Sequence, residues 1–156
     1  MDLDRIELAD VHDPRALARM LSFRLGTEVK AVPVVEIAQA LDIAEVRIAQ
    51  FDGFEGMLVT DRVRSYGAIL ANSMHGNRRA RFTVAHELGH FLLERHRFSG
   101  RKGFLCRTED MSETRSDRLH RRQETEANLF AIELLAPARL ANQRFGSAYA
   151  VNLIRF

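Results

Sequence analysis

The residues best suited to chemistry in this chain of 156 residues are His86, Glu87 and His90, which form a His-Glu-x-x-His pattern. In an α-helix, side chains four positions apart lie on one face, so the two imidazoles can reach a single cation. Glu87 projects in a neighbouring direction, where a carboxylate can take a proton from a water molecule bound to that cation. The pattern therefore predicts a metal-dependent hydrolytic site with Glu87 as its general base.

A hydrolytic zinc site usually has three protein ligands, so a third donor is expected further along the chain. The stretch Glu124-Thr125-Glu126-Ala127-Asn128 offers two glutamates in a helical pattern. Glu124 and Asn128 share a helix face, which suits a metal ligand and a side chain that orients a neighbouring ligand. Glu126 points elsewhere. We favour Glu124 over Glu126 as the ligand and expect the other glutamate to be a solvated helix charge.

The predicted site is shared between two helices. Over residues 81–94 the apolar side chains gather on one face, as in a helix buried on one side: Val84, Ala85, Leu88, Phe91 and Leu92. Gly89 removes a side chain between the two histidines, where another element could approach. A second helical pattern runs over residues 118–135 and would carry Glu124.

The rest of the chain is expected to support these two helices. A first helix is predicted after Asp13-Pro14, a capping residue followed by a proline at the first helical position, and Gly26 would end it. A shorter helix is predicted over residues 33–41. Three short strands are predicted, over residues 45–51, 56–60 and 66–70. They suggest an antiparallel meander.

The whole chain, residues 1–156, is predicted to be one domain. Its composition, 46% hydrophobic and 28% charged, is typical of a soluble globular protein. The single cysteine, Cys106, excludes an internal disulfide framework and fits a reducing compartment. The N-terminus lacks the features of a signal peptide, and no stretch has the length of a membrane span, so we expect a cytoplasmic protein without a membrane partner. Residues 95–117 are basic and without periodicity, which predicts a long loop.

Two stretches of the sequence resemble one known family. RRARFTVAHELGHFLLE and, later, QETEANLFAIELLAP are similar to the two signature helices of the ImmA/IrrE metallopeptidases. These signatures are Arg-Phe-Thr-x-Ala-His-Glu-x-Gly-His and Glu-x-x-Ala-Asn-x-Phe-Ala-x-x-Leu-Leu-x-Pro. The likeness covers residues 30–137. It implies an α+β, zincin-like fold in which a small antiparallel or mixed sheet of about three strands lies beside the active-site helix and several other helices.

The resemblance also implies a site and a substrate class. His86, His90 and Glu124 would bind Zn²⁺, with Mn²⁺ or Fe²⁺ as possible alternatives, and Glu87 would be the base. Similar members of the family are intracellular regulatory peptidases that cleave or inactivate helix-turn-helix repressors or antitoxins. The interval of 34 positions from His90 to Glu124 is longer than is usual in the family. We attribute the difference to an insertion within residues 95–117.

Hydrolysis of a peptide bond also needs a donor for the negative charge that develops on the carbonyl oxygen. The sequence offers Tyr66, His75, His96 and His120, and their spacing singles out none of them. His75 is the first choice because it lies in a turn-rich stretch beside a predicted edge strand. A peptide substrate is then expected to add to the sheet along residues 67–72.

Two other functions remain open. The same scaffold could sequester a repressor without cutting it, with the metal serving the structure. Residues 32–51 also have the apolar spacing of the first part of a helix-turn-helix, which would make the protein a DNA-binding regulator. Residues 1–62, however, hold 7 Lys and Arg against 12 Asp and Glu. Because a helix that reads DNA needs basic residues, the sequence argues against direct binding of nucleic acid.

Overall fold

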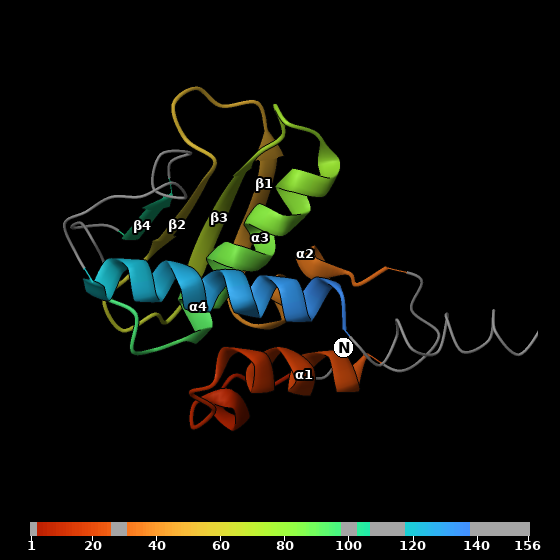
Figure 1. Ribbon diagram of the computed structural model, residues 1–156, viewed down its shortest axis with the longest axis vertical. Helices are drawn as coiled ribbons and strands as arrows, with labels where there is room; N and C mark the ends of the chain where they lie inside the picture. Colours follow the sequence, from red (N-terminus) through yellow and green to blue (C-terminus); the bar gives the residue numbers. More distant parts are fainter. Residues whose placement is uncertain (1–2, 26–30, 98–102, 107–117, 138–156) are drawn as a thin grey trace, which may run out of the picture.

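The computed structural model describes residues 3–25, 31–97, 103–106 and 118–137, and a four-stranded sheet forms one layer of it (Figure 1). The strands are β1 (Ile43–Ala49), β2 (Gly56–Thr60), β3 (Gly67–Asn72) and β4 (Gly103–Cys106). Their order across the sheet is β1-β3-β2-β4. β1 and β3 run parallel, and the other two pairs are antiparallel.

This strand order shows that the predicted antiparallel meander is wrong. β1 pairs with β3, from Ile43 opposite Gly67 to Ala49 opposite Asn72, and not with β2, which follows it in the chain. β3 is mostly buried, whereas β1 is mostly exposed or half-buried, so the more apolar strand takes an interior position. β3 is therefore not an edge strand. The expected addition of a substrate strand along residues 67–72 is wrong for the same reason.

The segment predicted to be a long loop contains the fourth strand. β4 pairs antiparallel with β2, with Gly56 opposite Cys106 and Val59 opposite Gly103. β4 has only four residues, Gly-Phe-Leu-Cys, and they show no alternation of polar and apolar side chains that would indicate a strand. The sheet thus has one strand more than expected, and β4 forms one of its edges. Residues 98–102 and 107–117 of the predicted loop lie outside the described residues.

The helices of the described residues are η1 (Ile6–Leu8, a 3₁₀ helix), α1 (Pro14–Arg24), α2 (Val34–Ala40), α3 (Asn77–Leu92) and α4 (Arg118–Leu135). Asp13 caps α1, since its side chain accepts a hydrogen bond of 2.6 Å from the backbone N–H of Ala16. Gly26, expected to end that helix, lies outside the described residues. The bounds predicted for α4 are confirmed, whereas α3 begins earlier than predicted because its polar first turn carries no apolar signal. Among the described residues, no helix is long and apolar enough to cross a membrane.

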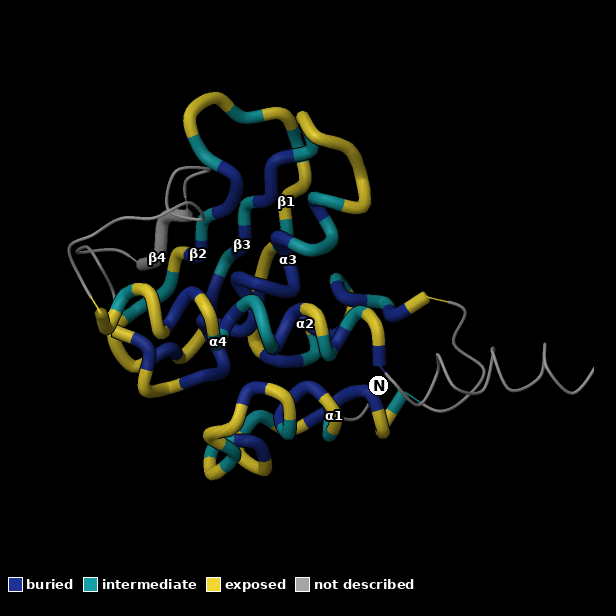
Figure 2. Tube along the Cα trace, viewed as in Figure 1, coloured by how far each residue is buried: buried dark blue, intermediate teal, exposed yellow. Residues whose placement is uncertain are grey.

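α3 lies between the sheet and α4. It packs against β2 and β3 on one side and against α4 on the other, and α1 packs against α4 in turn (Figure 1). Every residue from Thr83 to Leu92 is buried. In Figure 2 most of α3 is dark blue, and β3 beside it alternates between dark blue and teal. This part of the helix, predicted to be buried on one face, is therefore enclosed all round, which fixes its side chains in place.

Residues 32–51 do not form a helix-turn-helix. α2 is followed directly by β1, and Asp42 makes the turn between them with a φ of 68°. Where a second helix would be needed to enter the DNA groove, the chain forms a strand of the sheet. The alternative of a DNA-binding regulator built on this segment is therefore wrong.

Candidate metal centre

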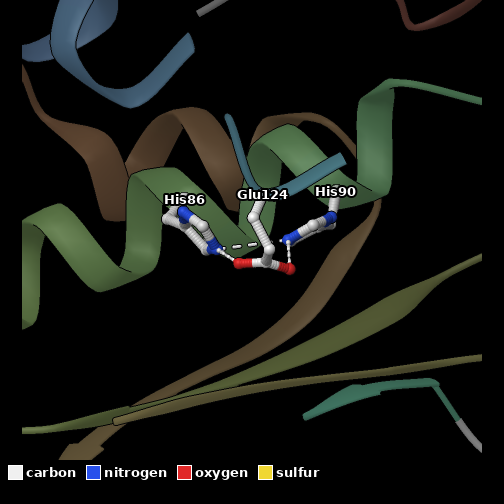
Figure 3. Close-up of side chains that lie close together, drawn as sticks. All are labelled: His86, His90 and Glu124. Atoms are coloured by element: carbon white, nitrogen blue, oxygen red, sulfur yellow. Dashed lines mark hydrogen bonds and ion pairs between the residues drawn. The ribbon is translucent and has the colours of Figure 1, made fainter. Parts of the chain in front are cut away.

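Three metal-binding side chains meet between α3 and α4 (Figure 3). The Nε2 atoms of His86 and His90, both on α3, are 3.1 Å apart. Glu124 on α4 places Oε2 3.2 Å from His86 Nε2 and Oε1 3.2 Å from His90 Nε2. Among the described residues, no other group of three or more His, Cys, Asp or Glu side chains could hold a metal ion. The structure thus brings Glu124, and not Glu126, to the two histidines.

The spacing of these atoms fits a zinc ion. Four ligand atoms placed tetrahedrally about 2.0 Å from a metal are about 3.3 Å from one another. The two Nε2 atoms are 3.1 Å apart and each lies 3.2 Å from a different oxygen of Glu124, so all of these separations are close to that value. Two imidazole nitrogens and a carboxylate at such distances direct lone pairs toward one another, and only a shared cation or proton makes that arrangement favourable. The donor set therefore suits a metal with three protein ligands and a fourth position for water or substrate.

Gly89 allows the two helices to approach closely. A Cβ atom at this residue would lie 3.3 Å from the Cα of Ala127 and 3.0 Å from Cδ1 of Phe130. Both neighbours belong to α4, the helix that carries Glu124. Because glycine has no side chain, α4 comes near enough for Glu124 to reach the histidines of α3. The prediction that another element approaches at Gly89 is confirmed.

The charge states of the cluster follow from burial and mutual contact. Burial lowers the pKa of His90 to about 3. Burial also disfavours the charged form of His86, but its hydrogen bond to Glu124 and the charge of Glu87 outweigh that effect and raise the pKa of His86. For Glu124, burial is likewise outweighed by the contacts with the two histidines, which lower its pKa. A metal ion entering the site therefore finds an ionised carboxylate on Glu124 and a neutral imidazole on His90.

Asn128 contacts the side of His86 that faces away from the cluster. Its Oδ1 atom is 2.9 Å from His86 Nδ1 and can accept the N–H of that ring. A hydrogen on Nδ1 leaves Nε2 with a free lone pair directed at the metal position. Asn128 lies one turn after Glu124 on α4, as the spacing of the two residues predicts.

His90 has a comparable neighbour that the sequence does not predict. Nδ1 of His96 is 2.9 Å from Nδ1 of His90, and Nε2 of His96 is 3.0 Å from Oε2 of Glu126. Glu126 also pairs with Arg95 and Arg122, so the expectation of a solvated helix charge is wrong. His96 lies beyond the end of α3, where no helical spacing links it to His90.

Glu87 lies where α3 packs on β2. Its side chain is 0% exposed. A Cβ atom at Gly56, the first residue of β2, would be 2.5 Å from Glu87 Oε1 and 2.4 Å from Cγ2 of Thr83. Asn72 holds this part of the sheet in place, because its backbone N–H donates a hydrogen bond of 2.9 Å to the carbonyl oxygen of Glu55. Gly56 thus makes room for the carboxylate of Glu87. The only indication of this role in the sequence is that a glycine stands at the start of an apolar strand, where it often marks the close approach of another group.

Two of the candidates for stabilising an oxyanion contact metal ligands. Nδ1 of His120, one turn before Glu124 on α4, is 3.9 Å from Glu124 Oε1. His96 lies behind His90, on the side away from the other two ligands. This position suits support of a ligand better than contact with a substrate.

The other two candidates contact residues outside the cluster. His75, the first choice from the sequence, is exposed, and its Nε2 lies 3.3 Å from Oε1 of Glu55. Tyr66 is also exposed, and its carbonyl oxygen accepts a hydrogen bond of 2.6 Å from Thr60 Oγ1. The geometry of the described residues therefore favours His120 over both.

A His-Glu-x-x-His helix beside a small mixed sheet, with a third ligand on the following helix, defines a zincin-like metallopeptidase of the α+β class. Comparison with known protein families matches residues 42–149 to the IrrE N-terminal-like domain, a family of peptidases. The chain belongs to this family. The match confirms the resemblance seen in the sequence, and it begins and ends later than residues 30–137. A search of curated proteins found no match.

Proposed function

We propose that this protein is a zinc-dependent endopeptidase that inactivates a regulatory protein by cleaving it. The observation that carries the proposal is the triangle of His86, His90 and Glu124, whose atoms have the spacing of zinc ligands, with Glu87 between the two histidines in the sequence. Zinc is preferred because two imidazoles and one carboxylate are its usual catalytic ligands, and Mn²⁺ and Fe²⁺ are the alternatives. Elemental analysis of the purified protein tests this choice.

Each residue of the proposed site has a separate role in hydrolysis. Zinc, when bound, would polarise the scissile carbonyl and make a water molecule acidic. Glu87 would accept the proton of the attacking water on its carboxylate and deliver it to the leaving nitrogen. Asn128 would hold His86 with its Nε2 lone pair toward the metal position. His120, which lies beside Glu124, is the preferred donor to the developing oxyanion.

The sheet provides a place for an extended substrate. An added peptide strand needs an edge with free backbone groups, and among the described strands only β1 and β4 lie at edges. β4 pairs with β2, and β2 begins at Gly56, next to Glu87. A peptide bound along β4 would therefore lie on the side of the sheet nearer to the proposed base than one bound along β1.

The proposed substrate is a helix-turn-helix repressor or an antitoxin. This class is what the resemblance to the ImmA/IrrE metallopeptidases implies, and it makes the protein a regulator of transcription. The proposed location is the cytoplasm, where such substrates are found. The test is to incubate the zinc-loaded protein with repressors encoded beside its gene and to search for cleaved products by mass spectrometry. The matched control is Glu87→Gln, which should yield no product.

A protein that binds its partner without cutting it is the second candidate function. It is favoured by the burial of the site, since the side chains of Glu87 and His90 are 0% exposed. Structural metal sites are closed in this way, whereas catalytic sites keep one position open to substrate. A stable complex between the zinc-loaded protein and a repressor, with no cleaved product after prolonged incubation, would establish this second function in place of the first.

A further inference from the structure

Behind the metal-binding side of His90, a chain of polar contacts leads away from the site. His96 is 2% exposed. Its Nδ1 lies 2.9 Å from Nδ1 of His90, and its Nε2 lies 3.0 Å from Oε2 of Glu126. The Nε2 of His90, on the opposite side of the ring, faces Glu124 and His86. The order of contacts is therefore carboxylate, imidazole, imidazole, metal position.

The positions of the hydrogen atoms in this series of contacts can be deduced by starting either from the metal position or from Glu126. A metal ligand must present a bare Nε2, so His90 carries its hydrogen on Nδ1 and donates it to His96. His96 must then accept on Nδ1 and carry its own hydrogen on Nε2. That hydrogen points at Glu126, and an ionised carboxylate can only accept it. Starting from Glu126 leads to the same arrangement, so every donor in the chain meets an acceptor.

His96 is held in place by its backbone. Arg64, itself buried, donates one hydrogen bond of 2.8 Å to the carbonyl oxygen of Glu94 and another to that of His96. On the other side, Gln123 of α4 accepts from the N–H of Arg97 at 2.9 Å and donates to its carbonyl oxygen at 3.0 Å. Hydrogen bonds from Arg64 and Gln123 thus hold the backbone on both sides of His96, which limits the positions that its ring can take.

Glu126 is also fixed in orientation. Its Oε2 lies 2.9 Å from Nη2 of Arg95, and its Oε1 lies 2.9 Å from Nε of Arg122. Hydrogen bonds between two charged groups are shorter and stronger than neutral ones. The two arginines therefore hold an ionised carboxylate with one oxygen directed at His96.

We propose that His96 and Glu126 are positioning residues that hold His90 in the orientation and tautomer needed for metal binding. Asn128 has the same relation to His86, so each histidine ligand has its own support on the Nδ1 side. Partners of this kind are known to set ligand orientation, and their loss commonly weakens metal affinity by about 10-fold to 100-fold. The inference rests on the proposed metal site, but it does not require that the protein cleaves a substrate.

Two substitutions of His96 distinguish the effect of losing its hydrogen bond to His90 from the effect of losing its ring. His96→Leu fills much of the space but cannot accept from His90, and we expect its zinc affinity to fall by about 10-fold to 100-fold. His96→Asn places an amide oxygen near the position of Nδ1 and should recover most of the affinity. Affinity is measured by competition with a chromophoric chelator, and the absorption spectrum of the Co²⁺-loaded protein reports the coordination geometry.

Glu126 provides a second variant that does not depend on the packing around His96. Glu126→Gln should lower zinc affinity by about tenfold, the lower end of that range, because a neutral amide can also present its N–H group to His96. The matched control is Glu133→Gln, the same change on the same helix at a residue that pairs with Arg19 instead. The control should bind zinc as the unchanged protein does.

A direct readout of the hydrogen positions completes the test. Long-range ¹H–¹⁵N spectra of the zinc-loaded protein should show His96 with its hydrogen on Nε2. Finding that hydrogen on Nδ1 would overturn the proposal, and so would unchanged zinc affinity in folded His96→Leu or equal losses in His96→Asn and His96→Leu. If the unchanged protein takes up no zinc, the proposed function fails instead, so the two failures are distinguishable.

Discussion

Gly56 of β2 lies so close to Glu87 of α3 that a Cβ atom added to the glycine would fall 2.5 Å from Glu87 Oε1. Real side chains do not tolerate such a distance, so any larger residue at position 56 must displace the strand or the carboxylate. The proposed base therefore depends for its position on a residue with no chemical group of its own.

Gly56→Ala should separate catalysis from metal binding. The added methyl group should shift Glu87, and a displacement of about 1 Å can lower kcat about 100-fold. The free energy of unfolding should fall by about 1–3 kcal/mol because the packing between α3 and β2 is strained. Zinc content should stay near that of the unchanged protein, since the atoms nearest to the added group belong to Thr83 and Glu87 and not to the three ligands. The measurements are cleavage rate, urea unfolding and elemental analysis.

The control for this variant is Gly67→Ala on the neighbouring strand. A Cβ atom there would lie 2.8 Å from Ile43 Cδ1 and 3.2 Å from Phe91 Cε2, so the overpacking is comparable but distant from Glu87. It should lower stability and leave kcat unchanged. Equal losses of kcat in both variants would show that general destabilisation, and not displacement of the base, lowers the rate.

Separate substitutions of Glu87 and Glu124 should have different effects on zinc binding. Glu87→Gln keeps the shape of the side chain but removes its basicity, so zinc should remain while cleavage falls by about 10²-fold to 10⁴-fold. Glu124→Ala removes a ligand, and the protein should lose its zinc. Zinc per chain and the cleavage rate are measured for both. Zinc loss in Glu126→Ala together with zinc retention in Glu124→Ala would reverse the ligand assignment.

The sequence predicts those parts of the site that lie on regular helices. The helical repeat alone places His90 on the same face as His86 and Asn128 on the same face as Glu124, because residues four positions apart must share a face. The same repeat predicts the bounds of α4, and the absence of a side chain at Gly89 predicts that another element approaches there. Local geometry determines each of these features, and local geometry is what a single sequence carries.

The features that the sequence does not predict depend on contacts between distant segments. The parallel pairing of β1 with β3 depends on which strand is buried more deeply, and alternation within a strand does not reveal its neighbours. His96 follows α3 without a helical spacing to His90, and it reaches Glu126 only because the turn folds back against α4. Gly56 gains its importance from a helix that follows it in the chain.

Gly89→Ala should weaken metal binding by moving the two helices apart. Its Cβ atom would press on the backbone of Ala127 and on the ring of Phe130, so α4 and Glu124 should shift away from the histidines. Overpacking costs about 1–3 kcal/mol, against a gain of about 1 kcal/mol from the higher helix propensity of alanine. We expect a small net loss of stability and a clear loss of zinc affinity, measured by unfolding and by chelator competition.

Ala127→Gly is the control on the facing helix. It removes a methyl group without adding bulk between α3 and α4, and it should cost about 1 kcal/mol of stability while leaving zinc affinity unchanged. If Gly89→Ala binds zinc as tightly as the unchanged protein, the close approach at this residue serves packing alone.

The metal-free protein should become less stable as the pH is lowered from 6.5 to 4. Burial lowers the pKa of His90 to about 3 and that of His96 to about 4, so both stay neutral in the folded protein while the unfolded chain protonates them near pH 6.5. The unfolded state then binds more protons, so the stability is complete above pH 6.5 and falls as the pH decreases toward 4. The pKa of His86 is raised and opposes this trend, so the measured slope is the sum of its effect and the opposite effects of His90 and His96. Urea unfolding in the presence of a chelator measures the slope.

His96→Leu identifies the part of this pH dependence that belongs to His96. The variant cannot gain a proton at residue 96 on unfolding, so its stability should fall less steeply than that of the unchanged protein between pH 6.5 and 4. A slope that is the same in the variant and in the unchanged protein would mean that His96 takes up its proton equally in the folded and unfolded states. Burial would then not hold this imidazole in the neutral form that accepts the N–H of His90.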